Sequence, residues 1–138
     1  NNKNHVFDAF ISHDDEITKV PAGSKILAGN NYTNVQAVVV KYKKGSFWAT
    51  QYHPEYDLYE ISRLILARKE KLIKSGIFLD EEALKSYVFD MESLYKDNSR
   101  KDLSWKLGID EDILDFKNRT MEFNNWLTTE VGLWFCFS

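Results

Sequence analysis

Residues 47–55 read FWATQYHPE, and this stretch decides how the first part of the chain folds. Its aromatic and β-branched residues alternate with small and polar ones, which predicts a β-strand that ends near His53. Pro54 then breaks the strand, because proline has no N–H group to donate to a sheet. Glu55 follows in the turn, where a carboxylate can orient a neighbouring imidazole. The stretch therefore predicts a general base with its orienting anion, which is half of a catalytic site whose nucleophile lies elsewhere.

The residues before this stretch also carry strand patterns. Residues 36–42 and 46–52 flank a short polar turn, so they predict a β-hairpin in which Gly45 takes a positive φ angle. A short strand is expected at 25–28, and the alternation over 6–12 predicts another. The N-terminal part of the chain is thus predicted to be built from strands.

Helical patterns replace the strand patterns after residue 56, where Leu, Lys, Glu and Asp recur at helical spacing. Asp57 is followed three residues later by a glutamate, a variant of the capping box that predicts the start of a helix over 57–75. Trp105 and Trp126 lie at helical spacing and are expected in the core. Further helices are expected from Asp80 to about Lys96, at 102–107 with Gly108 at its end, and from about Asp110 to Leu127.

Composition narrows the class of protein. The chain has 138 residues, of which 43% are hydrophobic, so it should fold as a globule with a core. The net charge of −3 argues against nucleic-acid binding, which needs concentrated Lys and Arg. No stretch approaches the roughly 20 apolar residues of a membrane span, and the polar start has no signal-peptide pattern. We therefore expect a soluble, cytoplasmic protein without a membrane or nucleic-acid partner.

The single cysteine and the three histidines bear on metal and disulfide chemistry. Cys136 is the only cysteine, which excludes a disulfide within the chain and suits a reducing compartment. His5 and His13 do not lie at zinc-like spacing from each other or from His53, so no metal site is predicted.

The string QYHPE at 51–55 resembles the signature of class I glutamine amidotransferases, which reads close to G-x-Q-x-H-P-E. The resemblance is close over residues 5–75 and looser over 76–131. It implies an α/β, flavodoxin-like fold and a Cys-His-Glu triad. By this match, His53 takes the proton from a cysteine thiol, and Glu55 holds the imidazole in the right tautomer.

A second segment resembles the same family. Residues 12–17, SHDDEI, are similar to the S-H-G-D-x-V segment, which lies near the glutamine pocket and implies substrate binding by Ser12 and His13 through backbone groups. Asp14 stands where the family usually has glycine. A side chain there changes the backbone angle or adds charge beside the pocket, so it bears on substrate preference.

The resemblance also implies where the nucleophile belongs. In the family the cysteine precedes the histidine and sits in a G-x-C-x-G elbow, whereas Cys136 follows His53 and has no flanking glycine. We interpret Cys136 as an ordinary thiol, and we expect the chain to be a fragment that lacks the nucleophile. Residues 1–75 would then be the C-terminal half of the catalytic domain, and 76–138 a helical extension packed on it, similar to that of GMP-synthase-like amidotransferases. Exposed sheet edges predict a homo-oligomer or association with the missing N-terminal half.

The reaction implied is hydrolysis of the side-chain amide of glutamine through a thioester, with ammonia passed to an acceptor. It needs no cofactor, and the family context implies a synthetase subunit or domain as partner. This chain alone would be inactive for want of the nucleophile. Two alternatives stay open, a γ-glutamyl hydrolase of the same fold, suggested by Asp14, and a catalytically inactive structural or binding module.

Overall fold

A computed structural model of the chain describes residues 3–131. Within this range the chain forms two compact units. The first is drawn from residues 1–54 and 120–138, and the second comprises residues 55–119. These are bounds of compact packing, and the division at residue 75 into a catalytic half and a helical extension stays a prediction.

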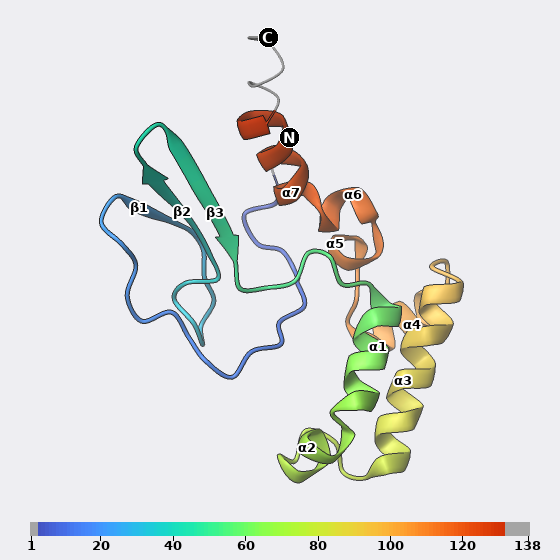
Figure 1. The fold of residues 1–138 in the computed structure, drawn as a ribbon. Coiled ribbons are helices and arrows are strands. Elements are labelled where there is room, and N and C mark those ends of the chain that lie inside the picture. The colour runs from blue at the N-terminus through green and yellow to red at the C-terminus, as the bar shows by residue number, and fades with distance from the viewer. Residues whose placement is uncertain (1–2, 132–138) are drawn as a thin grey trace. The chain divides into compact units, whose positions relative to one another are not determined.

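The first unit contains an antiparallel sheet of three strands in the order β1-β2-β3 (Figure 1). The strands are β1 (Ser24–Ala28), β2 (Ala37–Tyr42) and β3 (Gly45–Thr50). In the hairpin, Val39 pairs with Trp48 and Tyr42 pairs with Gly45. The predicted hairpin and the short strand at 25–28 are therefore confirmed.

The turn of the hairpin differs from the prediction in one respect. Lys43, not Gly45, has the positive φ angle, at 54°. Gly45 already pairs with Tyr42 as the first residue of β3, so it needs the extended backbone of a strand. The left-handed conformation consequently falls on the first residue of the two-residue turn, as the twist of a tight hairpin requires.

The strand predicted over residues 6–12 is wrong. Only Ile11 forms a β-bridge, with Tyr52, and β3 itself ends at Thr50. The rest of the segment is irregular because alternation supplies a side-chain pattern but not a neighbouring strand to pair with. One backbone bond continues the bridge, since the His53 N–H donates to the Phe10 carbonyl at 2.8 Å.

Two short helical segments complete the described part of the first unit. They are α7 (Met121–Trp126) and the π-helix η1 (Leu127–Val131). Figure 1 shows the N-terminal end of the described chain beside α7, and Lys3 bonds to Glu122 there at 2.6 Å. The buried apolar residues of this unit are Val35, Ala37, Val38 and Tyr52.

The second unit is helical. The capping box that opens its first helix is confirmed, because the Glu60 N–H donates to Asp57 Oδ1 at 2.9 Å and the Asp57 N–H donates to Glu60 Oε2 at 3.0 Å. The helix predicted over 57–75 is interrupted at Arg68, and Gly76 ends the second piece with φ of 78°. The helices of this unit are α1 (Leu58–Ala67), α2 (Lys69–Lys74), α3 (Glu81–Lys96), α4 (Lys101–Leu107), α5 (Glu111–Leu114) and α6 (Phe116–Arg119).

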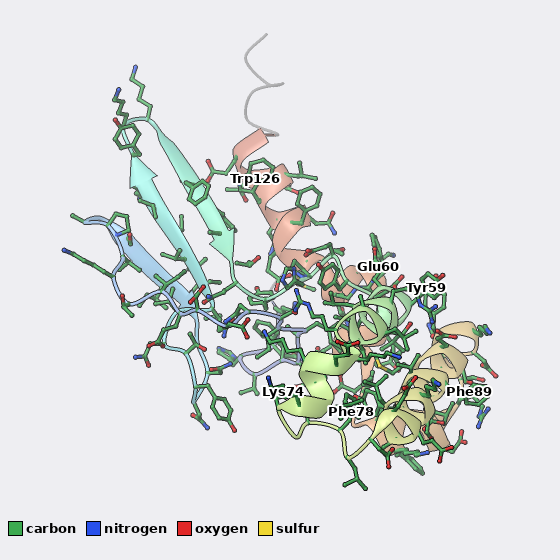
Figure 2. The ribbon with its side chains drawn as sticks, turned by 60° about the horizontal axis from the view of Figure 1, so that its bottom comes forward. Tyr59, Glu60, Lys74, Phe78, Phe89 and Trp126 are labelled. Carbon is green, nitrogen blue, oxygen red and sulfur yellow. The ribbon has the colours of Figure 1, made fainter. Side chains whose placement is uncertain are left out.

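The core of the second unit lies between α1 and α3. Its most deeply buried apolar side chains come from one face of α3, and Leu58 and Ile61 of α1 are buried as well. Arg63 of α1 and Glu92 of α3 form an ion pair, and the rings of Tyr59 and Tyr95 lie 5.7 Å apart. Figure 2 shows Tyr59 on α1 and Phe89 on α3 among the side chains of this unit. The buried residues of α3 are Leu84, Val88, Met91 and Leu94.

Two helical predictions are wrong. Trp105 is 81% exposed instead of buried, because α4 is short and turns Leu103 and Ser104 inward on its other side. The single helix expected from Asp110 is broken into α5, α6, α7 and η1. The helix predicted over 102–107 is confirmed, as is its end at Gly108, which has φ of 65°. None of the helices in the described part of the chain combines the length and the apolar character that crossing a membrane requires.

Candidate active site

His53 lies just past the end of β3 and is half-buried. Its backbone N–H donates to the Phe10 carbonyl at 2.8 Å, and the preceding residue, Tyr52, forms the bridge with Ile11. The strand end that carries the predicted general base is therefore fixed by the N-terminal segment, even though that segment is not a strand.

The segment that carries Ser12 and His13 is tied to the same end of the sheet. His13 Nδ1 donates to the Asp15 carbonyl at 2.8 Å, which leaves Nε2 to accept from the Gln36 side-chain amide at 3.4 Å. The Gln51 side-chain amide donates to the same Asp15 carbonyl at 2.8 Å. Because Gln51 also pairs through its backbone N–H with Gln36, the loop and both strand ends form one hydrogen-bonded group. The structure thus brings His13 and the strand leading to His53 to one end of the sheet.

Asp14, the residue that replaces the family's glycine, is exposed and lacks a positive φ angle. Its backbone conformation is therefore open to any L-residue, and the replacement introduces no strain. The side chain adds negative charge to a stretch that continues with Asp15 and Glu16, both exposed. Both expected effects, a backbone angle different from that of glycine and an added charge, are compatible with this conformation, and the effect on substrate preference stays a prediction.

Glu55 is exposed and begins the second unit, whereas His53 belongs to the first. The pairing of His53 with Glu55 stays a prediction. Cys136, which we interpreted as an ordinary thiol, lies outside the described residues.

Tyr52 is buried at the strand end and is held by its side chain. It is only 5% exposed, and its hydroxyl donates to Glu122 Oε1 at 2.6 Å. Burial raises the pKa of Tyr52 above its usual value, and the hydrogen bond to Glu122 and its negative charge raise the pKa further. The phenol therefore stays protonated and acts as a donor throughout the ordinary pH range.

A cavity of about 990 Å³ lies within the first unit, between the N-terminal segment, the sheet and α7. Trp126, labelled on α7 in Figure 2, is among its lining residues, as are Phe7, Val38, Trp48 and Tyr52. Ser12, His13 and His53 are not among them. Tyr52 thus lines the cavity, whereas the neighbouring His53 does not.

Sequence reasoning missed three residues of this region, namely Lys3, Gln36 and Glu122. Gln36 was interpreted only as part of a strand, although it is buried and contacts His13. Glu122 lies 70 residues from Tyr52 in the sequence, so no local pattern connects them. The described residues hold no group of three or more His, Cys, Asp or Glu arranged to bind a metal ion.

Comparison with known proteins gives a family match and several relatives. The family model described as glutamine amidotransferase class-I matches residues 1–71, which is more than half of the chain. It agrees with the small sheet and helices described above, and it supports the α/β, flavodoxin-like fold expected from the sequence. No solved structure matches.

One relative matches most of the chain. It is a gamma-glutamyl-L-1-hydroxyisopropylamide hydrolase from a Pseudomonas species, 29% identical over 123 residues, which are 88% of this chain and 41% of that protein. A subunit of the glutamine-hydrolysing GMP synthase from Ignicoccus hospitalis is 35% identical over 68 residues, 49% of this chain and 35% of its own length. The corresponding subunit from Methanocaldococcus jannaschii is 43% identical over 49 residues, 36% of this chain and 25% of its own length. The chain thus spans less than half the length of each of these relatives.

Proposed function

Because this chain belongs to the class I glutamine amidotransferase family, we propose that it supplies the general base of a Cys-His-Glu triad that hydrolyses the side-chain amide of glutamine. The observation that carries the proposal is the position of His53. It lies just past the end of β3, in a segment that is held by Phe10 and Ile11, and the loop with Ser12 and His13 is bonded to the same end of the sheet.

The chemistry assigned to His53 is proton transfer in both directions. Its imidazole takes the proton from a cysteine thiol, and the thiolate attacks the amide carbonyl of the substrate. The imidazolium then protonates the departing nitrogen, so that ammonia leaves and a thioester remains. Water, deprotonated by the same imidazole, hydrolyses the thioester to glutamate. Glu55 keeps the imidazole in the required tautomer and stabilises its positive charge.

The nucleophile comes, in this proposal, from the part of the family's domain that lies outside the 138 residues. The relatives have ample further length to hold it, since the chain spans 41% of the hydrolase and 35% of the Ignicoccus protein. The outer edges of β1 and β3 have no neighbouring strand in the described part of the chain. We propose that such an edge pairs with the nucleophile-bearing half or with a second copy of this chain.

Ser12 and His13 are assigned to the binding of the substrate's α-amino and α-carboxyl end. Both ring nitrogens of His13 are engaged within the chain, by the Asp15 carbonyl and the Gln36 amide, so the assigned contacts come from backbone groups of this loop, whose position is set before a substrate arrives. Such preorganisation reduces the entropy lost on binding. We further propose that the protein acts in the cytoplasm and passes ammonia to a synthetase subunit or domain, as the relatives that belong to GMP synthases suggest.

A second candidate function is hydrolysis of an N-substituted γ-glutamyl amide. The match to the Pseudomonas hydrolase extends over 123 residues, whereas the matches to the two GMP synthase proteins cover 68 and 49. Its reaction would use His53 in the same way but release an amine, which needs no synthetase. Comparing glutamine with γ-glutamyl alkylamides as substrates of the complete gene product separates the two functions.

The test of the triad is covalent labelling with a glutamine-mimicking diazoketone, followed by peptide mass mapping. We expect an adduct on a cysteine of the complete gene product, and its loss in His53→Ala and Glu55→Gln. His5→Ala and Glu16→Gln are the matched controls, because both residues are exposed and have no role in the proposed triad. Labelling that persists in His53→Ala would contradict the role of His53, and no adduct in the unaltered protein would leave the inactive binding module as the remaining function.

A further inference from the structure

Three segments of the first unit meet at the Tyr52 side chain. The Tyr52 hydroxyl comes from the strand end, the Lys3 ammonium from the N-terminal segment, and the Glu122 carboxylate from α7. Both the hydroxyl and the ammonium donate to the same oxygen, Glu122 Oε1, at 2.6 Å each. Figure 1 shows how α7 and the N-terminal end lie side by side, which is the arrangement that lets one carboxylate reach both donors.

Aromatic contacts also hold the Lys3 and Tyr52 side chains. The Lys3 ammonium lies 4.3 Å from the centre of the Phe7 ring, within the range of a cation–π contact. The Phe7 and Tyr52 rings are 5.6 Å apart and inclined at 69°, an edge-to-face arrangement. Lys3 is 12% exposed and Glu122 21% exposed in their side chains, so their attraction is little screened by solvent.

The second carboxylate oxygen, Glu122 Oε2, is buried and has no hydrogen-bond partner within the described part of the chain. All the hydrogen bonds that compensate for burying this carboxylate therefore converge on Oε1. A buried carboxylate is costly to leave unsatisfied, so removal of either donor displaces the side chain or draws in water. The positions of Tyr52 and Glu122 are consequently coupled.

His53 is the next residue along the chain. The side chain of the preceding Tyr52 is anchored by Glu122, and the His53 N–H donates to the Phe10 carbonyl. Because Tyr52 and His53 share a planar peptide unit, anchoring the Tyr52 side chain restricts the backbone position from which the His53 imidazole projects. We propose that Lys3, Tyr52 and Glu122 are positioning residues, which aim His53 at the nucleophile without touching the substrate.

This inference rests on the proposed function of His53. The effect of changing a positioning residue is therefore measured on the rate of the reaction that His53 catalyses. A misplacement of about 1 Å in a catalytic group costs on the order of 10²-fold in rate. For Tyr52→Phe, which removes only the hydroxyl, we expect kcat to fall by between about tenfold and a hundredfold while KM changes less than about twofold. For Glu122→Gln, whose amide oxygen still accepts from Tyr52, we expect a smaller loss of about two- to fivefold. The double variant should lose no more than the larger single loss, because both changes act through one group.

A second readout separates positioning from mere stability. A correctly aimed His53 lowers the pKa of its cysteine partner, so the alkylation rate rises at a lower pH than for an ordinary thiol of pKa about 8.5. In Tyr52→Phe the midpoint of this profile should move upward toward that value. The matched controls are Tyr42→Phe in the hairpin and Glu130→Gln in η1, which should leave both kcat and the profile unchanged.

The experiment uses the complete gene product, with thermal unfolding recorded for each variant. Tyr52→Phe with the kcat and alkylation profile of the unaltered protein would overturn the inference, whatever its thermal midpoint, and would show a purely structural contact. If Tyr52→Phe does not fold, Glu122→Gln decides by the same two readouts. His53→Ala is run in parallel, because its activity would refute the proposed function itself, whereas its inactivity beside an unaffected Tyr52→Phe would refute only the positioning cluster.

Discussion

Leu84→Ala in α3 is the substitution that most severely tests the packing of the second unit. Leu84 is 0% exposed, as is Leu94, and lies in the core between α1 and α3. Replacing a buried leucine by alanine costs about 2.7–5 kcal/mol, and the cost rises with the cavity that remains. Since this side chain is fully enclosed, we expect a loss in the upper part of that range, about 3–5 kcal/mol.

The matched control is Leu79→Ala. Leu79 precedes the same helix but is 89% exposed, so the same chemical change should alter the free energy of unfolding by less than about 0.5 kcal/mol. Urea unfolding followed by circular dichroism measures both variants. A loss below about 1 kcal/mol for Leu84→Ala, or equal losses for the two variants, would refute the packing of α3 described here. If Leu84→Ala is unfolded at the outset, Leu84→Val, which removes less volume, gives the comparison.

Three further predictions concern the pH dependence of stability, a helix end and a helix start. The pKa of Tyr52 is raised in the folded protein and near 10 in the unfolded chain, so its contribution to stability is complete below about pH 10 and is lost as the pH rises further. Urea unfolding from pH 8 to 11 should show this loss in the unaltered protein and not in Tyr52→Phe. Gly108→Ala should cost about 1–2 kcal/mol of unfolding free energy because Gly108 has φ of 65°, whereas Gly45→Ala, at an ordinary strand position, should cost less than about 1 kcal/mol. Equal costs measured by urea unfolding would contradict the assignment of the helix end. Asp57→Ala should cost about 1 kcal/mol and Glu60→Gln much less, since glutamine also completes a capping box; a thermal midpoint that drops equally in both would argue against the box.

Much of the fold was predictable because it depends on local chemistry. The hairpin follows from two runs of alternating residues around a polar turn, and α1 follows from the Asp57 cap. The end of α4 follows from Gly108. In each case the residues that determine the element are close neighbours in the sequence, so their pattern is sufficient.

The errors concern elements that depend on distant partners. Alternation over residues 6–12 shows which side chains are apolar but not whether a strand lies beside them. Of these residues, only Ile11 forms a β-bridge, with Tyr52. Trp105 lies on an amphipathic pattern, yet α4 is too short to cover more than one face. Periodicity likewise did not reveal the breaks that separate α5, α6 and α7.

For the candidate site, the string at 51–55 predicted that His53 lies near the end of a strand, and the structure has it just past the end of β3. The residues around it were not predictable in the same way. Glu122 meets Tyr52 across 70 residues, and Gln36 meets His13 across 23. These contacts depend on how the chain returns to the sheet, which no local pattern records.

The measurement that tests the central claim most directly is ammonia release from glutamine by the complete gene product, comparing His53→Ala with His5→Ala. If His53 is the general base of a Cys-His-Glu triad, His53→Ala should lower kcat by at least about 10²–10⁴-fold, the usual contribution of such a base, while His5→Ala retains full activity. Ammonia release by His53→Ala at the rate of the unaltered protein would contradict the assignment of His53 and the triad with it.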